Sequence, residues 1–301
     1  MPSVFDNYLD PEVLFMTSIF RTISAVILIV IALTSSVVAA DNLSTAESTT
    51  LIPPSSHKSQ AVELNKEYFV GYWTDTKNIL TAPWRWDSSD WLEASLVMGT
   101  GVILYTQDDK IKTWFQKNKD STKDNLAKDA KKLYSLFLPA VAGFGIYGYV
   151  APDEKAKTTF LLSIESFLLT GAFVQTLKYT TGRHRPYTGD PHDTWSGPTT
   201  KDEWHSFPSG DASTAFSIAS VIASEYPNIV VQSLVYGVSG LIGLQRIYAN
   251  GHWASDVFIG SAIGYYTGKA IVASHSNKES KVSISPLIDD HNRGVLITYR
   301  F

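Results

Sequence analysis

Apolar segments alternate with polar loops along the chain from about residue 90 to residue 273. The segments are 14 to 19 residues long and contain scattered Ser, Thr, Gln, Glu and Gly. This length and patterning favour helices over strands. The predicted fold class is all-α, a bundle of about six core helices. The six predicted helices are Trp91–Thr106, Leu133–Val150, Thr159–Leu177, Ala212–Glu225, Ile229–Leu244 and Asp256–Ala273.

The polar connections carry their own pattern. The stretch QDDKIKTWFQKNKDSTKDNLAKDAKK separates the first two apolar segments, and we interpret it as a solvated helix face or a loop. At the C-terminal end Val295, Ile297, Tyr299 and Phe301 alternate with other residues after the turn-forming stretch DDHNRG, which predicts a β-hairpin. One hairpin cannot close an outer-membrane barrel, so we expect it to pack on the helical domain.

The N-terminal segment predicts export. The apolar run AVILIVIAL follows Arg21, and small residues suited to cleavage after Ala40 come next. We therefore predict a signal peptide over residues 1–40. The acidic residues before Met16 do not suit the positively charged start of such a peptide, so a translation start at Met16 is an alternative. A single membrane anchor is the alternative. Residues 41–60, rich in Ser, Thr and Pro, predict a flexible linker, residues 61–273 the main domain and residues 274–301 a tail.

Composition narrows the class of protein. The 301 residues carry a net charge of −4 and no cysteine, which excludes disulfides and thiolate metal ligands. Without a clustered basic surface, nucleic acid is not an expected partner. A membrane span needs about 20 mainly apolar residues, and the mean hydropathy is only −0.02. We favour a helical domain in a bacterial periplasm that contacts the membrane, with an integral membrane protein as the alternative.

Three polar clusters flank the apolar segments. KYTTGRHRP places Lys178 and Arg185 about two helical turns apart, and a helix ending near Gly182 brings both cations to one side, as a phosphate dianion requires. The alternative is a basic helix C-terminus that complements the helix dipole. FPSGDAS places Ser209 and Gly210 at a helix N-terminus, either as an anion-binding nest or as a simple cap.

The third cluster, RIYANGHWASD, contains Arg246, His252 and Asp256. His252 and Asp256 are four residues apart, so on a helix they share a face. A carboxylate there can accept one ring N–H while the other ring nitrogen faces a substrate. Alternatively, the His–Asp pair is purely structural.

The three clusters in this order resemble the type 2 phosphatidic acid phosphatase (PAP2) family, which shares its site with the vanadium haloperoxidases. The resemblance covers residues from about 90 to 273. It implies that His252 attacks phosphorus to form a phosphohistidine and that Asp256 orients its ring. Lys178, Arg185, Arg246 and the backbone around Ser209 and Gly210 would bind the phosphoryl oxygens. No metal or other cofactor is implied, and vanadate is expected to inhibit.

Two positions depart from the family pattern. Gln245 stands where the family has Ser, and Asp211 stands where the family has the His that protonates the leaving oxygen. Nearby cations favour the charged carboxylate, whereas a bound dianion and burial favour the neutral acid. Three outcomes follow. Asp211 acts as the protonated acid at low pH, or the enzyme uses a substrate such as a pyrophosphate, whose departing phosphate needs little protonation. In the third, another residue donates the proton. The loop candidates are His184, His192 and His205, although we expect them to be ordinary exposed histidines.

The resulting prediction is a metal-independent phosphatase acting on phosphate or pyrophosphate monoesters, on a phosphorylated lipid or a small phosphate ester. The alternative is a non-catalytic protein that binds phosphate or interacts with the envelope, with Asp211 as the sign of lost activity. A haloperoxidase ranks lower because the chain is short for that group. Tyr187, Trp195 and Trp204, in the loop between the first two clusters, either line an entrance for lipid or form its apolar cover. The sequence does not indicate the oligomeric state.

Overall fold

The computed structural model describes residues 66–276, 282–289 and 292–299. The predicted signal peptide, residues 1–40, and the predicted linker, residues 41–60, lie outside the described residues. The chain divides into two compact units. Of the described residues, 87–100 belong to the first unit, and 66–86 together with all those from Gly101 onward belong to the second. The second unit therefore contains every predicted site residue.

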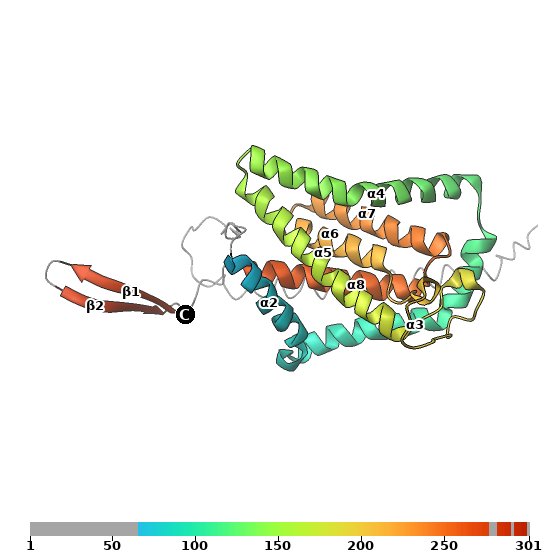
Figure 1. Ribbon diagram of the computed structural model, residues 1–301, viewed down its shortest axis with the longest axis horizontal. Coiled ribbons are helices and arrows are strands. Elements are labelled where there is room, and N and C mark those ends of the chain that lie inside the picture. Colours follow the sequence, from blue (N-terminus) through green and yellow to red (C-terminus); the bar gives the residue numbers. More distant parts are fainter. Residues whose placement is uncertain (1–65, 277–281, 290–291, 300–301) are drawn as a thin grey trace, which may run out of the picture. The chain divides into compact units, whose positions relative to one another are not determined.

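Seven α-helices make up most of the described part of the chain, which confirms the all-α prediction (Figure 1). They are α2 (Lys66–Leu80), α3 (Ser88–Lys117), α4 (Ser121–Val150), α5 (Glu154–Thr181), α6 (Gly210–Glu225), α7 (Ile229–Tyr248) and α8 (Ala254–His275). Short 3-10 helices occur at Ala82–Arg85, Pro186–Thr188 and Asp202–Trp204. Helix α2 was not predicted, because its sequence KEYFVGYWTDTKNIL mixes polar and apolar residues without a long apolar run.

The helices are longer than the apolar segments that predicted them. Helices α3 and α4 each have 30 residues, since the charged stretch between their apolar parts is itself helical except for a short break. At this break the Asp120 side chain caps α4 by accepting a hydrogen bond from the backbone N–H of Lys123 at 2.9 Å. Most of this stretch is exposed or half-buried, as a solvated helix face predicts, but Asp108 is buried.

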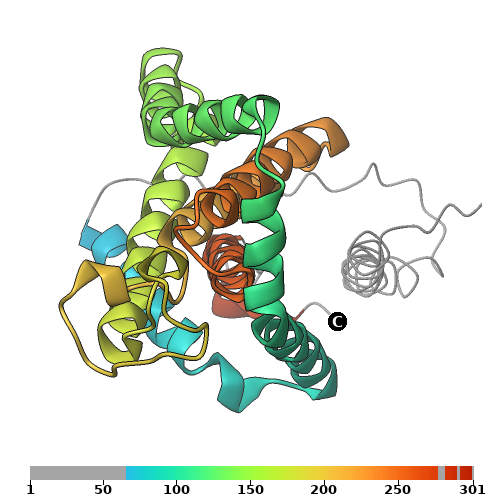
Figure 2. The same cartoon turned by 90° about the vertical axis from the view of Figure 1, so that its right-hand side faces the viewer.

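Helix α6 forms the centre of the bundle and packs against α5, α7 and α8. Its small side chains allow close contact, above all with α8. A Cβ atom added at Gly264 of α8 would lie 2.1 Å from the backbone oxygen of Ser213, so only glycine fits there. Fully buried residues line α6 along its length: Ala212, Ala215, Ile218, Ala219 and Val221. The loop over residues 182–209 (yellow) lies beside the start of α8 in both views (Figures 1 and 2).

In the described part of the chain, three helices are long and apolar enough to cross a membrane: α4, α5 and α7. Only 17% of the most apolar window of α4 and 22% of that of α7 are buried inside the protein, so these helices present apolar side chains outward. The apolar segments predicted from the sequence were too short to span a membrane, because the prediction left out the polar ends of these helices. The long apolar helices indicate membrane association.

The predicted C-terminal hairpin is confirmed by an antiparallel strand pair, β1 (Val282–Asp289) and β2 (Asn292–Tyr299). The register pairs Val282 with Tyr299 and Asp289 with Asn292. The packing of this hairpin on the helical domain stays a prediction.

Candidate active site

The C-terminal end of α5 turns the chain sharply into the first polar cluster. Gly182 ends the helix in the left-handed conformation, with φ of 59°. A Cβ atom at this position would lie 2.1 Å from the backbone oxygen of Gly197, so both conformation and space require glycine. In the last turn, Lys178 is buried and its Nζ donates to the backbone oxygen of His205 at 2.6 Å. The sharp turn at Gly182 therefore allows Lys178 and Arg185 to approach each other at the end of α5, as the sequence predicted.

Arg183 is the centre of a buried ion-pair network that the sequence did not identify. Its side chain is 1% exposed, and one guanidinium nitrogen donates to Asp108 at 2.8 Å while another pairs with Asp256. Two further bonds go to the backbone oxygen of His192. Arg183 therefore ties α3, the loop and the start of α8 together. The charge of Asp108 inside an otherwise amphipathic stretch was the only sequence sign of this network.

Asp256 holds several groups in place from the first turn of α8. Its carboxylate accepts hydrogen bonds from the Trp253 backbone N–H at 3.0 Å and from the Ser206 hydroxyl at 2.5 Å, besides its ion pair with Arg183. A carboxylate is favourable at a helix N-terminus. His252 precedes the helix, so the expectation that His252 and Asp256 share a helix face is wrong.

The His252 imidazole is oriented by a backbone carbonyl rather than directly by Asp256. Its Nδ1 lies 2.7 Å from the Ser206 oxygen but 4.0 Å from Asp256 Oδ2. Because a carbonyl only accepts, Nδ1 carries the proton and the lone pair of the neutral ring is on Nε2. Asp256 acts on this ring indirectly, since it holds the hydroxyl of the same Ser206 whose carbonyl orients His252.

Cations surround the free nitrogen of His252. Nε2 lies 3.5 Å from a guanidinium nitrogen of Arg185. Burial lowers the pKa of His252 well below its usual range, and the positive charges of Lys178, Arg185 and Arg246 lower it further. The ring is therefore neutral at physiological pH. An unprotonated imidazole nitrogen among three cations is suited to attack an anionic phosphoryl group.

The N-terminus of α6 faces the same cations. Gly210 begins this helix, and Ser209 precedes it with its backbone N–H donating to the backbone oxygen of Asp256 at 3.0 Å. The Ser209 hydroxyl is buried without a hydrogen-bond partner among the described residues. The side chain of Lys178 lies next to Gly210, since a Cβ there would be 3.7 Å from Lys178 Cε. Free N–H groups at a helix start and a nearby lysine favour anion binding.

Asp211 is engaged with a cation of the same cluster. Its Oδ2 lies 3.0 Å from Nε of Arg246, and the side chains are 29% and 22% exposed. The Tyr134 side chain of α4 hydrogen-bonds the same carboxylate. Arg246 itself comes from the last turn of α7. Asp211 therefore lies beside the phosphate-binding candidates and has a proton-bearing neighbour in Tyr134.

The loop histidines are less exposed than expected, and each has its own partners. His184 contacts Asp190 and Ser196 and stacks on Trp204, while His205 bonds the Thr199 backbone oxygen. His184 and His205 are buried, and His192 pairs with Asp109 at 2.6 Å. Trp195 donates to Tyr105 and packs on Phe207. Tyr187 is half exposed.

The match to known proteins falls on this part of the chain. The sequence profile of the PAP2 superfamily matches residues 159–280, which include all three clusters. This segment of the chain is therefore similar to the PAP2 superfamily. A lipid A 1-phosphatase of Porphyromonas gingivalis is 36% identical over 125 residues. That match covers 41% of this chain and 25% of the relative, so the chain spans about a quarter of that protein's length.

Two solved structures are also similar. The crystal structure of Aquifex aeolicus LpxE gives a TM-score of 0.45 with 25% identity, covering 55% of this chain and 94% of that one. A PAP2-type phosphatidylglycerolphosphate phosphatase of Bacillus subtilis gives 0.42 with 17% identity, covering 59% and 92%.

Proposed function

We propose that the protein is a PAP2-type phosphatase that hydrolyses phosphate or pyrophosphate monoesters of lipids through His252. The observation that carries this proposal is the neutral His252 ring, whose Nε2 faces Arg185 while Nδ1 is fixed on the Ser206 carbonyl. A general cation patch would bind phosphate without needing an oriented imidazole. A purely structural histidine would not need three cations around its free nitrogen.

The proposed reaction has two displacements. In the first, the Nε2 lone pair forms a bond to phosphorus as the bond to the leaving oxygen breaks, and Asp211 gives that oxygen a proton when the leaving group requires one. In the second, water attacks phosphorus and gives a proton to the Asp211 carboxylate as the bond between phosphorus and Nε2 breaks, which releases inorganic phosphate and restores the neutral ring. Lys178, Arg185 and Arg246 stabilise the charge on the phosphoryl oxygens, together with the N-terminus of α6 from Gly210 onward. No step in this sequence needs a metal.

Asp256 is proposed as a positioning residue. It holds Ser206 by a hydrogen bond to the hydroxyl, and Ser206 in turn accepts the His252 N–H through its carbonyl. Arg183 holds Asp256 in place by a buried ion pair. The orientation of the nucleophile thus rests on a chain of contacts from Arg183 to His252.

A lipid substrate is proposed from two observations. The outward faces of α4 and α7 are apolar, which supports a location at a membrane, where lipid phosphates are found. The P. gingivalis relative is named for action on the phosphate of a lipid. Together with the predicted export signal, this favours an enzyme that acts at the periplasmic side of a bacterial membrane.

A second candidate is a phosphate-binding protein without turnover. It is favoured by the ion pair between Asp211 and Arg246, because the carboxylate neutralises a cation that a substrate phosphate would otherwise use. Loss of a general acid typically lowers rates by about 10²–10⁴-fold and does not abolish them. We therefore place this candidate second.

Phosphate release distinguishes the two candidates. The full chain in detergent is supplied with a short-chain lipid phosphate in the presence of a chelator, with and without vanadate. Vanadate-sensitive release in the wild type, absent from His252→Ala, is the expected result. Binding of the lipid phosphate with no release at any pH between about 4 and 9 would favour the second candidate.

A further inference from the structure

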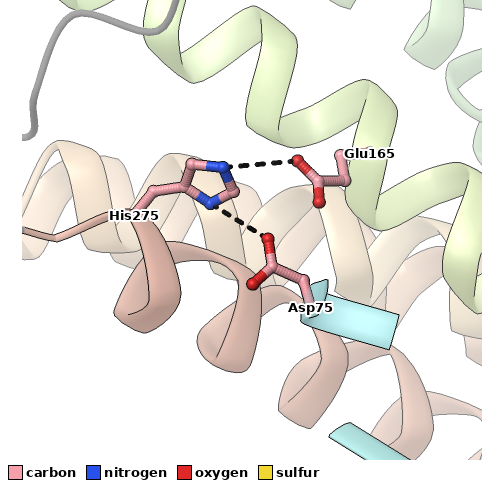
Figure 3. Close-up of side chains that lie close together, drawn as sticks. All are labelled: Asp75, Glu165 and His275. Atoms are coloured by element: carbon pink, nitrogen blue, oxygen red, sulfur yellow. Dashed lines mark ion pairs between the residues drawn. The ribbon is translucent and has the colours of Figure 1, made fainter. Parts of the chain in front are cut away.

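Three ionisable side chains from three helices meet away from the candidate active site: Asp75 of α2, Glu165 of α5 and His275 at the end of α8 (Figure 3). One nitrogen or oxygen atom from each lies within 4.8 Å of the others. At 1.5 Å per residue, Glu165 is about 20 Å along α5 from Lys178. The cluster is therefore separate from the phosphate-binding candidates.

The surroundings of this cluster are apolar. Glu165 lies one helical turn from Leu162 and Leu169, and His275 lies one turn after Ile271, all of which are buried in the same core cluster. Helix α2 packs against this core on both sides of Asp75, through Tyr72 and Ile79. Ionised carboxylates are costly in such a place unless a positive charge compensates them.

Glu165 lacks a hydrogen-bond partner. It is 1% exposed, and neither of its carboxylate oxygens has a partner among the described residues. Figure 3 shows the carboxylate directed at the His275 ring, with Oε2 3.8 Å from Nε2. Asp75 Oδ2 lies 3.6 Å from Nδ1 of the same ring. Both separations exceed hydrogen-bond lengths.

The His275 ring has a defined orientation. Its Nδ1 lies 3.1 Å from the Ile271 carbonyl oxygen, which only accepts, so Nδ1 carries the proton. In the neutral ring the lone pair on Nε2 then faces an oxygen of Glu165. Two acceptors directed at each other in an apolar core are stable only when a cation or a proton lies between or beside them.

We propose that Asp75, Glu165 and His275 bind a divalent cation, with Zn²⁺ the best match. One oxygen from each carboxylate and Nε2 of His275 supply three ligands, and water completes a four-coordinate site. Two ligands about 2.1 Å from one tetrahedral metal are about 3.4 Å apart, close to the 3.8 Å between Glu165 Oε2 and His275 Nε2. Nitrogen and carboxylate donors suit Zn²⁺, and two positive charges balance two carboxylates.

The role of this site is structural. The ion joins α2 to α5 and α8 at the end of the bundle that does not carry His252. Donation of Nδ1–H to a backbone carbonyl is the usual way in which a metal-binding histidine is held in place. The site is independent of the proposed phosphatase reaction, which uses none of these three residues.

Metal titration tests the proposal. The purified full chain in detergent is stripped with a chelator and titrated with Zn²⁺, and bound metal and Tm are measured. We expect one Zn²⁺ per chain and a rise in Tm on binding. Glu165→Gln and His275→Gln should weaken Zn²⁺ binding at least about tenfold. Glu154→Gln, on the same helix with a 58% exposed side chain, is the matched control and should bind as wild type does.

A spectroscopic measurement covers the case in which a variant fails to fold. Co²⁺ added to the stripped wild-type chain should give the intense visible absorption of a four-coordinate ion, and excess Zn²⁺ should remove it. The proposal is overturned if the wild type binds no more Zn²⁺ than Glu165→Gln, or if it shows neither a Zn²⁺-dependent rise in Tm nor a Co²⁺ spectrum. The three residues would then form a carboxyl cluster that shares a proton.

Discussion

Arg183 and Asp256 form a fully buried ion pair, with side chains 1% and 0% exposed. Arg183 also pairs with Asp108 of α3, so one guanidinium group compensates two buried carboxylates. Asp256 in turn holds Ser206, whose carbonyl orients His252. The position of the candidate nucleophile, His252, therefore depends on Arg183, which acts on it through Asp256 and Ser206.

Arg183→Met should be strongly destabilising. It would leave two carboxylates buried without a counter-charge, a change that typically costs about 3–5 kcal/mol. Thermal or denaturant unfolding of the purified variant measures this loss. Arg85→Met is the matched control, because Arg85 is exposed and bonds only nearby groups of its own segment. Equal effects of the two substitutions would contradict the importance given to the buried network.

Gly182 and Gly189 provide a matched pair for the turn after α5. Both have positive φ, at 59° and 87°, but a Cβ at Gly182 would lie 2.1 Å from a backbone oxygen whereas Gly189 has open space. Gly189→Ala should cost only the strain of the left-handed conformation, about 1–2 kcal/mol. Gly182→Ala should cost clearly more and should also lower phosphate release, because Lys178 and Arg183 flank this turn. Similar unfolding free energies for both variants would show that close packing at Gly182 is not required.

The pH dependence follows from the lowered pKa of His252. The folded protein resists protonation of this ring, so the nucleophile stays neutral as pH falls through about 6.5, the ordinary value for histidine. The wild-type profile of kcat/KM should therefore show no loss of activity from His252 near that pH. The unfolded chain does bind this proton below about 6.5, so the same group lowers folding stability there. An acidic limb near pH 6.5 that persists in Asp211→Asn would contradict the neutral, buried ring.

Asp211 is tested by two substitutions. If it donates the proton to the leaving oxygen, Asp211→Asn should lower kcat by about 10²–10⁴-fold on a substrate with a poor leaving group and by less on a pyrophosphate. Asp211→His should move the pH optimum upward, because an imidazolium keeps its proton to higher pH than a carboxyl group. Wild-type kcat in Asp211→Asn on both substrates would exclude Asp211 as the acid.

The sequence predicted the helices and the polar clusters well, because both depend on local spacing. Glycine at position 182 and Pro-Ser-Gly before α6 indicated the turns that bring Lys178, Arg185 and Ser209 together. Contacts between distant segments were not predictable in the same way. Arg183 was passed over because its partner Asp108 lies 75 residues away in a stretch that looks solvated. The Ser206 carbonyl that orients His252 belongs to the backbone, which carries no residue-type signal.

The central claim is that His252 is the nucleophile, and trapping its phosphorylated form tests this most directly. Wild-type chain is mixed with a lipid phosphate labelled in the phosphoryl group, quenched in alkali, where phosphohistidine survives, and analysed for labelled peptides. The account predicts label on the peptide that contains His252, released by acid, and no label or turnover in His252→Ala. Phosphate release that persists in His252→Ala, or label on a different residue, would contradict it.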